Sequence, residues 1–155
     1  MRAGKEIIVV MLLFAAAAQA QLAPNAPADK PIGTDAEELQ EIEKRIVPLI
    51  EEARRTFPAA RDRYLKGLPP RHVFFVTTVL TDSQGRREQV FIEVKTIKEG
   101  RISGKIANEI RLVSGYRTGD EYTLPEGEIR DWLISKPDGS EEGNVIGKFL
   151  DTYQR

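Results

Sequence analysis

Residues 100–134 read GRISGKIANEIRLVSGYRTGDEYTLPEGEIRDWLI, and this stretch decides the fold that the sequence predicts. Its first part, 101–106, alternates apolar and polar residues, which is typical of a strand with one buried face. Two more short strands are expected at 121–124 and 129–135, on either side of a proline-glycine corner. The single tryptophan of the chain, Trp132, lies in the last of them. Short strands joined by glycine corners indicate an antiparallel sheet.

The preceding residues predict a long antiparallel hairpin. Residues 72–81, HVFFVTTVLT, are apolar at both sets of alternate positions, which is typical of a central strand covered on both faces. Residues 82–85 fit a type I turn, with aspartate first and glycine last. Residues 87–97 then alternate apolar and polar side chains, as the second strand of a hairpin does.

Helices are expected before and after the strands. A capping box at Thr34 opens a helix whose apolar residues follow at steps of three and four. Because Pro48 falls inside this pattern without shifting its phase, we expect one kinked helix or two abutting ones. Pro58 is expected to open a further short helical segment, which ends at Gly67. A last, short amphipathic helix is expected from about residue 144. The apolar stripe of the first helix consists of Leu39, Ile42, Ile46, Ile50, Ala53 and Phe57.

Together these elements predict one α+β domain over residues 34–155. We expect an N-terminal kinked helix, or helices, packed on a curved five-stranded antiparallel sheet, with a short C-terminal helix. Short, curved antiparallel strands favour an SH3-like or partly open small barrel.

The N-terminus has the pattern of an export signal. Residues 1–20 combine a basic start, twelve apolar residues and a small-x-small site, which predicts a signal peptide cleaved between Ala20 and Gln21. Glu6 is unusual in the basic part, so an uncleaved anchor is the alternative. Residues 21–33 then form a Pro/Ala-rich tether. We therefore expect a periplasmic or secreted protein with no stable membrane insertion after cleavage.

Composition excludes several classes of function. The chain has no cysteine, which removes disulfides, thiol nucleophiles and thiolate metal sites. A formal net charge of -1 gives no electrostatic case for nucleic acid as a partner. His72, the single histidine, has no partner at an informative spacing and is interpreted as a surface residue. The sequence therefore predicts no catalytic residue, no metal site and no cofactor.

The candidate binding residues are Asn108, Asp131 and Trp132. Alternation along the last strand puts Asp131 on one face and Trp132 on the other. If Asp131 faces inward, it needs hydrogen-bond donors, and Asn108 is one candidate partner. If Trp132 faces inward, it is a core residue and Asp131 is solvated. A third alternative exposes Trp132 as a binding surface; the structural role is favoured.

Three glycines are explained by the backbone and not by a ligand. A close approach between strands, a positive φ angle or a bulge each requires glycine. The three are Gly104, Gly119 and Gly127.

The same stretch resembles the domain of unknown function 2314, a YegJ-like family. The resemblance covers roughly residues 46–134 and implies a family without an established biochemical activity. The family often continues after Asp-Trp with a glycine pair and another strand, whereas this chain shows a helical pattern from about residue 144. The resemblance is carried by Gly100-x-Ile102-x-Gly104-x-Ile106-x-Asn108, by Gly119-Asp120 and by Ile129-x-Asp131-Trp132.

We interpret the chain as an exported, non-catalytic binding or interaction module of the cell envelope. Its partner would be an unknown protein or small molecule. One alternative is a hydrolase-type enzyme with a shallow site near Asp131 and Asn108. The other is a structural accessory subunit of an envelope assembly.

Overall fold

A computed structural model of the chain describes Pro27 and residues 36–153. The predicted signal peptide, the capping box at Thr34 and all of the tether except Pro27 lie outside the described residues. The described elements are α1 (Ala36–Lys66), β1 (Val73–Thr81), β2 (Arg87–Lys98), β3 (Arg101–Ile106), β4 (Glu121–Pro125), the 3-10 turn η1 (Glu126–Glu128), β5 (Asp131–Ser135), β6 (Glu141–Gly143) and α2 (Val145–Tyr153).

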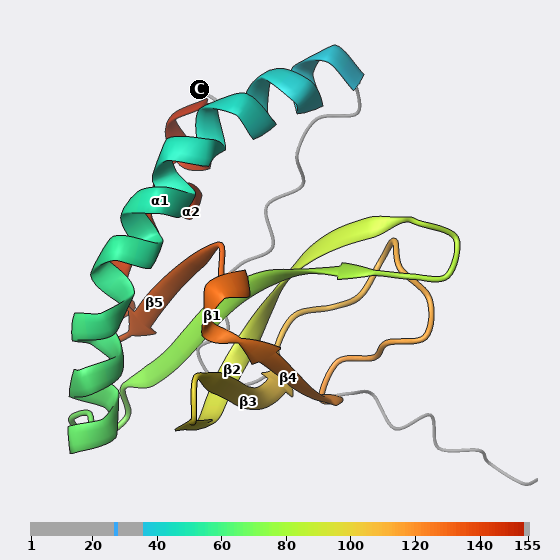
Figure 1. The fold of residues 1–155 in the computed structure, drawn as a ribbon. Coiled ribbons are helices and arrows are strands. Elements are labelled where there is room, and N and C mark those ends of the chain that lie inside the picture. Colours follow the sequence, from blue (N-terminus) through green and yellow to red (C-terminus); the bar gives the residue numbers. More distant parts are fainter. Residues whose placement is uncertain (1–26, 28–35, 154–155) are drawn as a thin grey trace, which may run out of the picture.

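The strands form one antiparallel sheet in the order β4-β3-β2-β1-β5-β6. The long helix α1 packs along one face of this sheet, and α2 lies beside α1 (Figure 1). The α+β class is therefore confirmed. The expected number of five strands is wrong, because β6 adds a sixth. The sheet is also open, with β4 and β6 at its edges, and the register closes no SH3-like barrel among the described strands.

One helix replaces the two expected helical segments, because α1 runs through both Pro48 and Pro58 without ending. Each proline removes one N–H donor from the helical ladder and pushes its ring against the preceding turn. Both prolines are exposed, on the side away from the sheet, where water can solvate the carbonyl groups left without donors. Figure 1 shows α1 bent along its length. The predicted break at Pro58 is therefore wrong. The bend agrees with the expectation of one kinked helix around Pro48.

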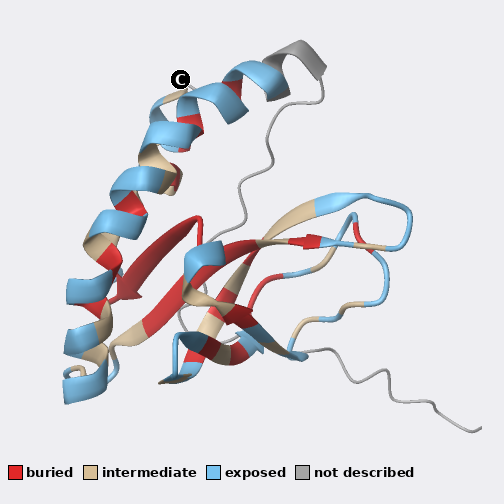
Figure 2. Ribbon diagram, in the orientation of Figure 1, coloured by how far each residue is buried: buried red, intermediate tan, exposed pale blue. Residues whose placement is uncertain are grey.

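The main core lies between α1 and the sheet (Figure 2). Two residues of the predicted stripe, Ala53 and Phe57, are buried against the strands, whereas Ile42 and Ile46 of the same stripe pack against α2. Phe74 of β1 is at the centre, since three aromatic rings pack around it: Phe57 at 6.2 Å, Tyr64 at 5.4 Å and Trp132 at 6.3 Å between ring centroids. These contacts fix where α1 sits on the sheet.

The central strand β1 is buried on both faces, as its sequence predicts. Phe74 points to the helix, and Phe75 belongs to a separate apolar cluster with Ala107 and Leu133. Because neighbouring residues of a strand point to opposite faces, β1 needs apolar side chains at consecutive positions. The run of apolar residues without polar alternation is thus explained.

The strand β6 follows a turn and pairs with the end of β5, Ser135 opposite Glu141. It is held from outside the sheet as well: Arg63 of α1 lies 2.7 Å from Glu142, and Lys136 lies 2.9 Å from the same carboxylate. Asn144 then turns the chain with a positive φ of 53° into α2. A short strand that was not expected therefore precedes α2, and α2 begins at Val145, close to the expected start at about residue 144.

Gly104 permits a close approach between β3 and β2. A Cβ atom at this position would lie 2.1 Å from the main-chain oxygen of Glu93, far inside any real contact. Its φ angle is not positive, so the reason for glycine is steric, as one of the predicted alternatives states. Gly119 has a positive φ of 88°, which is another of the predicted reasons for glycine. Gly127 shows neither a positive φ nor a close contact at its Cβ position.

We predict that Gly104→Ala lowers the free energy of unfolding by about 1–3 kcal/mol, the range seen when a packed interior is overfilled. Gly127→Ala is the matched control, because a Cβ atom there meets nothing within 4 Å, and we expect a change within about 0.5 kcal/mol. Urea unfolding followed by circular dichroism measures both. Equal stability of the two variants would show that the strands can separate at Gly104 without cost.

Candidate functional site

Asp131 opens β5 and is 1% exposed. Its Oδ1 accepts a hydrogen bond from the main-chain N–H of Trp132 at 2.8 Å, and its Oδ2 accepts one from Ile146 at 2.8 Å. Ile146 is the second residue of α2, where main-chain N–H groups have no partner inside the helix. The carboxylate of Asp131 therefore caps α2 and joins it to the sheet.

Burial raises the pKa of the Asp131 carboxyl to about 6. The hydrogen bonds from Ile146 and Trp132 and the charge of Lys148 act in the opposite direction, while the charge of Glu52 raises the pKa further. Burial has the largest effect, since the interior solvates a charge less well than water does. A perturbed pKa can accompany catalysis, but both oxygens of this group already accept hydrogen bonds from the main chain.

Trp132 faces α1 and is 9% exposed, within the main core. Its Nε1–H donates a hydrogen bond to Thr56 Oγ1 of α1 at 2.9 Å, and its ring meets Phe74 edge-on. The alternative of an exposed Trp132 surface is wrong. The alternative in which an inward Trp132 leaves Asp131 solvated is wrong as well, because both faces of β5 are buried.

Asn108 follows β3 and extends the pairing of β3 with β2. Its Oδ1 accepts a hydrogen bond from Phe91 N–H at 2.8 Å, next to the bond from Ala107 N–H to Phe91 O. Its main-chain oxygen accepts a hydrogen bond from Thr118 Oγ1 at 2.8 Å, which fastens the connection between β3 and β4. Asn108 thus acts as a main-chain substitute at the end of a strand.

The structure does not bring Asn108 and Asp131 together. Thr77 of β1 pairs with Asp131 on one side and with Phe91 on the other, so two strands separate the candidate partners. The donors to Asp131 are main-chain groups, and the expected bond from Asn108 is absent between these two described residues. All three candidates hold the fold together in this geometry.

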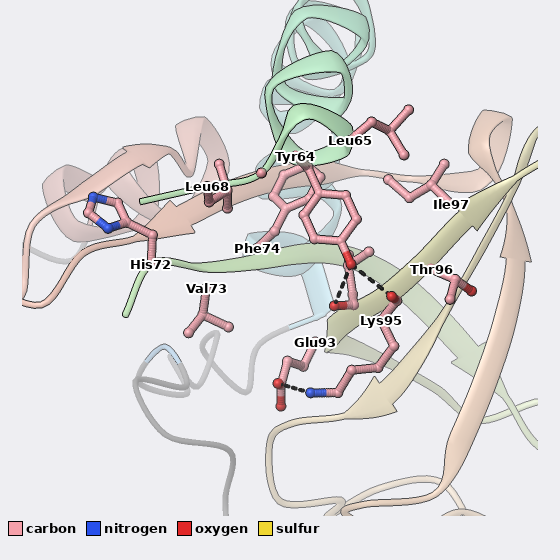
Figure 3. Close-up of a pocket in the computed structure, with 12 residues that line it drawn as sticks. Tyr64, Leu65, Leu68, His72, Val73, Phe74, Glu93, Lys95, Thr96 and Ile97 are labelled. Carbon is pink, nitrogen blue, oxygen red and sulfur yellow. Dashed lines mark hydrogen bonds and ion pairs between the residues drawn. The ribbon is translucent and has the colours of Figure 1, made fainter. Parts of the chain in front are cut away.

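A groove lies elsewhere, at the end of the sheet where α1 finishes (Figure 3). Its volume is about 590 Å³, and it is open to solvent. The register between β1 and β2 ends at the pair Phe75 and Glu93, although β2 continues to Lys98. The two strands therefore diverge, and the last turns of α1 lie above the gap.

A β-bulge shapes the β2 side of this groove. The register of β2 with β3 passes from Val94 opposite Gly104 to Thr96 opposite Ser103, so Lys95 is the extra residue. A bulge increases the local twist and bends the strand that carries it. The bend turns the end of β2 away from β1, and the close approach of Gly104 to Glu93 lies directly beside it.

Tyr64 closes the inner end of the gap. Its hydroxyl donates a hydrogen bond to Lys95 O at 2.8 Å, and Val94 O lies 3.4 Å away. Burial raises the pKa of the Tyr64 hydroxyl, and the charge of Glu93 adds to the effect, so the group stays a donor at neutral pH. In Figure 3 the Tyr64 ring points from α1 toward β2, and a dashed line joins its hydroxyl to Lys95.

The walls of the groove combine apolar and polar side chains. Leu65 is 58% exposed above the gap, and Leu68 and Ile97 are half-buried beside it. Glu93 and Lys95 form an ion pair at the mouth, and His72 Nδ1 lies 3.2 Å from Pro70 O. No group of three His, Cys, Asp or Glu side chains that could hold a metal ion occurs in the part of the chain that the structure describes.

Sequence reasoning missed this groove, because no motif marks it. Tyr64 and Leu68 carry the ordinary pattern of a helix face, and Lys95 continues the alternation of β2. Gly104 was the one available signal, since a bulge was among its three explanations. The position of the bulge, however, depends on the pairing of β2 with β3.

The fold and the site define a class: a small α+β protein whose open antiparallel sheet has a solvent-open groove where two strands diverge. The chain belongs to the bacterial family described as "Uncharacterized protein conserved in bacteria (DUF2314)", whose model matches residues 28–152. The family resemblance of the sequence is therefore confirmed.

A relative in Escherichia coli (strain K12), "Uncharacterized protein YegJ", is 29% identical over 82 residues. The match covers 53% of this chain and 53% of that protein, so the chain spans about half the length of its relative. No solved structure matches this chain. Among the described helices, neither is both long enough and apolar enough to cross a membrane.

We predict that Asp131 makes the fold less stable as the pH rises. Its pKa is about 6 in the folded protein against 3.8 as the ordinary value, so the folded state holds the proton more tightly. The contribution of this group is therefore largest below about pH 4 and is lost as the pH rises through about 6, a change of about 3 kcal/mol. Urea unfolding between pH 4 and pH 8 measures it.

The variant Asp131→Asn has no titrating carboxyl at this position and should lack its pH-dependent contribution to stability. The difference in unfolding free energy between variant and wild type should therefore change with pH. Asp138→Asn is the control, because hydrogen bonds from Ser140 hold the pKa of the Asp138 carboxyl below its ordinary value. Removing that group changes the pH dependence below about pH 4 and not near pH 6. Parallel curves of unfolding free energy against pH for wild type and Asp131→Asn would contradict a raised pKa of the buried Asp131 carboxyl.

Proposed function

We propose that this protein is a non-catalytic binding module and that the groove between β1 and β2 is its ligand site. One observation carries the proposal: the sheet opens into a space of about 590 Å³ that its own side chains leave unfilled. Ligand sites in proteins are typically concave, mostly apolar and about 300–1,000 Å³ in volume, with a few polar groups that orient the ligand. This groove is open to solvent and has walls of that kind, with Tyr64, His72 and Lys95 as polar groups.

The other two functions have less support. A hydrolase near Asp131 and Asn108 would need both side chains at a cleft, and each is buried with main-chain partners. An accessory subunit would use a large exposed apolar patch or a long free edge strand. The edge strand β6 has three residues, and β4 ends in a proline. Binding in the groove is therefore the function we favour.

We also propose that the protein acts outside the cytoplasm. The apolar run of residues 1–20 and its small-x-small site support export, and the absence of cysteine means that no disulfide has to form there. A periplasmic or secreted binding protein fits both features.

Export predicts a mature chain that starts at Gln21. We expect N-terminal sequencing of the protein from fractionated cells to read QLAPN in the periplasmic or extracellular fraction. An Ala18→Arg, Ala20→Arg variant should stay uncleaved, since the cleavage site needs small residues. A wild-type chain recovered from the cytoplasm with Met1 intact would contradict export, while leaving the groove untouched.

The binding role predicts where small probes contact the protein. We expect N-acetylated amino-acid amides, monosaccharides or short carboxylates, added to 15N-labelled protein, to shift amide signals around the groove. Leu65→Arg should remove these shifts, because the charged side chain enters the space above β2. Leu112→Arg is a matched control, since Leu112 is 60% exposed and does not line the groove. Probes that bind only elsewhere, or shifts that persist in Leu65→Arg, would overturn the proposal.

A further inference from the structure

The groove contains an unpaired strand edge inside the sheet. Residues Thr96, Ile97 and Lys98 pair with β3, while the register with β1 stops at Glu93. Main-chain groups of alternate residues in a strand point to opposite neighbours. The end of β2 therefore presents main-chain donors and acceptors to the gap, where β1 has already turned away.

The contact of Tyr64 shows that a main-chain oxygen of this edge accepts a hydrogen bond from a side chain. Its hydroxyl donates to Lys95 O, a main-chain acceptor of the same strand. An unsatisfied main-chain group costs free energy when water is excluded, so each needs a partner. Tyr64 serves the innermost position, and the residues beyond it remain open along the groove.

The side chains around the edge suit an extended chain. Leu65 and Ile97 lie on the helix side of the gap, and Val73 lies at its opposite wall (Figure 3). Alternate side chains of a strand point to opposite faces, so a bound strand would place one set against these residues and leave the other in solvent. The groove is open, which allows a chain to enter and to continue past it.

We propose that the groove binds an extended peptide segment of a partner protein, which adds to the end of β2 as a strand. This inference rests on the proposed function and names its ligand class. Strand addition uses main-chain hydrogen bonds for affinity and side-chain pockets for selectivity, and both are present here.

A second copy of this chain is a worse occupant than a partner peptide. Lys95 and Lys98 flank the edge, and both are exposed. Lysines and bulges are common devices against pairing of exposed edges, and a second copy of β2 would carry both of them into the pair. A peptide strand without a bulge or lysines lacks these obstacles.

The test starts from a phage-displayed library of random dodecapeptides, selected on the purified protein. We expect selected peptides to bind wild type and Leu112→Arg alike, and to bind Leu65→Arg about tenfold or more weakly. Circular dichroism and thermal unfolding establish that both variants are folded. The peptides should carry alternating apolar residues, and binding is measured by fluorescence polarisation.

Main-chain pairing is tested by N-methylation of the selected peptide, one amide at a time. Methylation at alternate positions should weaken binding about tenfold, and methylation at the positions between them should have little effect, since only every second N–H donates to β2. Strand addition is overturned if N-methylation has no alternating effect on peptide binding. It is also overturned if the peptides bind Leu65→Arg as tightly as wild type.

The two proposals fail in different ways. If no peptide is selected while the small probes still shift groove signals, the groove is a ligand site for small molecules and the peptide inference is wrong. If neither probe reaches the groove, both proposals are wrong.

Discussion

The packing of three aromatic rings around Phe74 is the interaction on which the rest of the structure depends. Phe57 and Tyr64 come from α1, Trp132 comes from β5, and Phe74 is the strand residue between them. Large rings bury much apolar area and restrict one another's orientation, so they fix the height and angle of the helix on the sheet. The position of Tyr64 in the gap between β1 and β2 follows from that anchoring. The core and the candidate site therefore have the same origin.

The sequence predicts most of the elements because their patterns are local. The helical stripe, the hairpin and the doubly buried strand β1 are each visible within a few consecutive residues, and all are present in the structure. The strand β6 could not be seen this way, because Glu141–Gly143 has no apolar alternation. Its partners are Leu133–Ser135 and the ion pair from Arg63, which lies 79 residues earlier in the chain. The number of strands and the open sheet depend on such distant contacts.

The candidate residues show a second limit of local patterns. Alternation correctly puts Asp131 and Trp132 on opposite faces, but the choice between them assumed that one face of β5 is solvated. The first turn of α2 donates a hydrogen bond to the carboxylate, and α1 accepts one from the indole. Both faces of β5 are therefore buried. Which side chains meet is a property of the assembled layers. The groove is missed for the same reason, because a bulge arises from the pairing of two strands and is not marked by either one alone.

An open strand edge inside a small domain is a hazard as well as a site. Such an edge invites pairing with any exposed strand, so folded proteins usually shorten it, bend it or flank it with charge. Here Tyr64 shortens the edge from the inner end, the bulge at Lys95 bends it, and Lys98 adds charge at the outer end. Continued pairing of β1 with β2 would have removed the hazard without these devices. The fold instead keeps a short open edge to which access is restricted. The proposed strand addition requires such an edge, because the restriction disfavours pairing with unrelated strands.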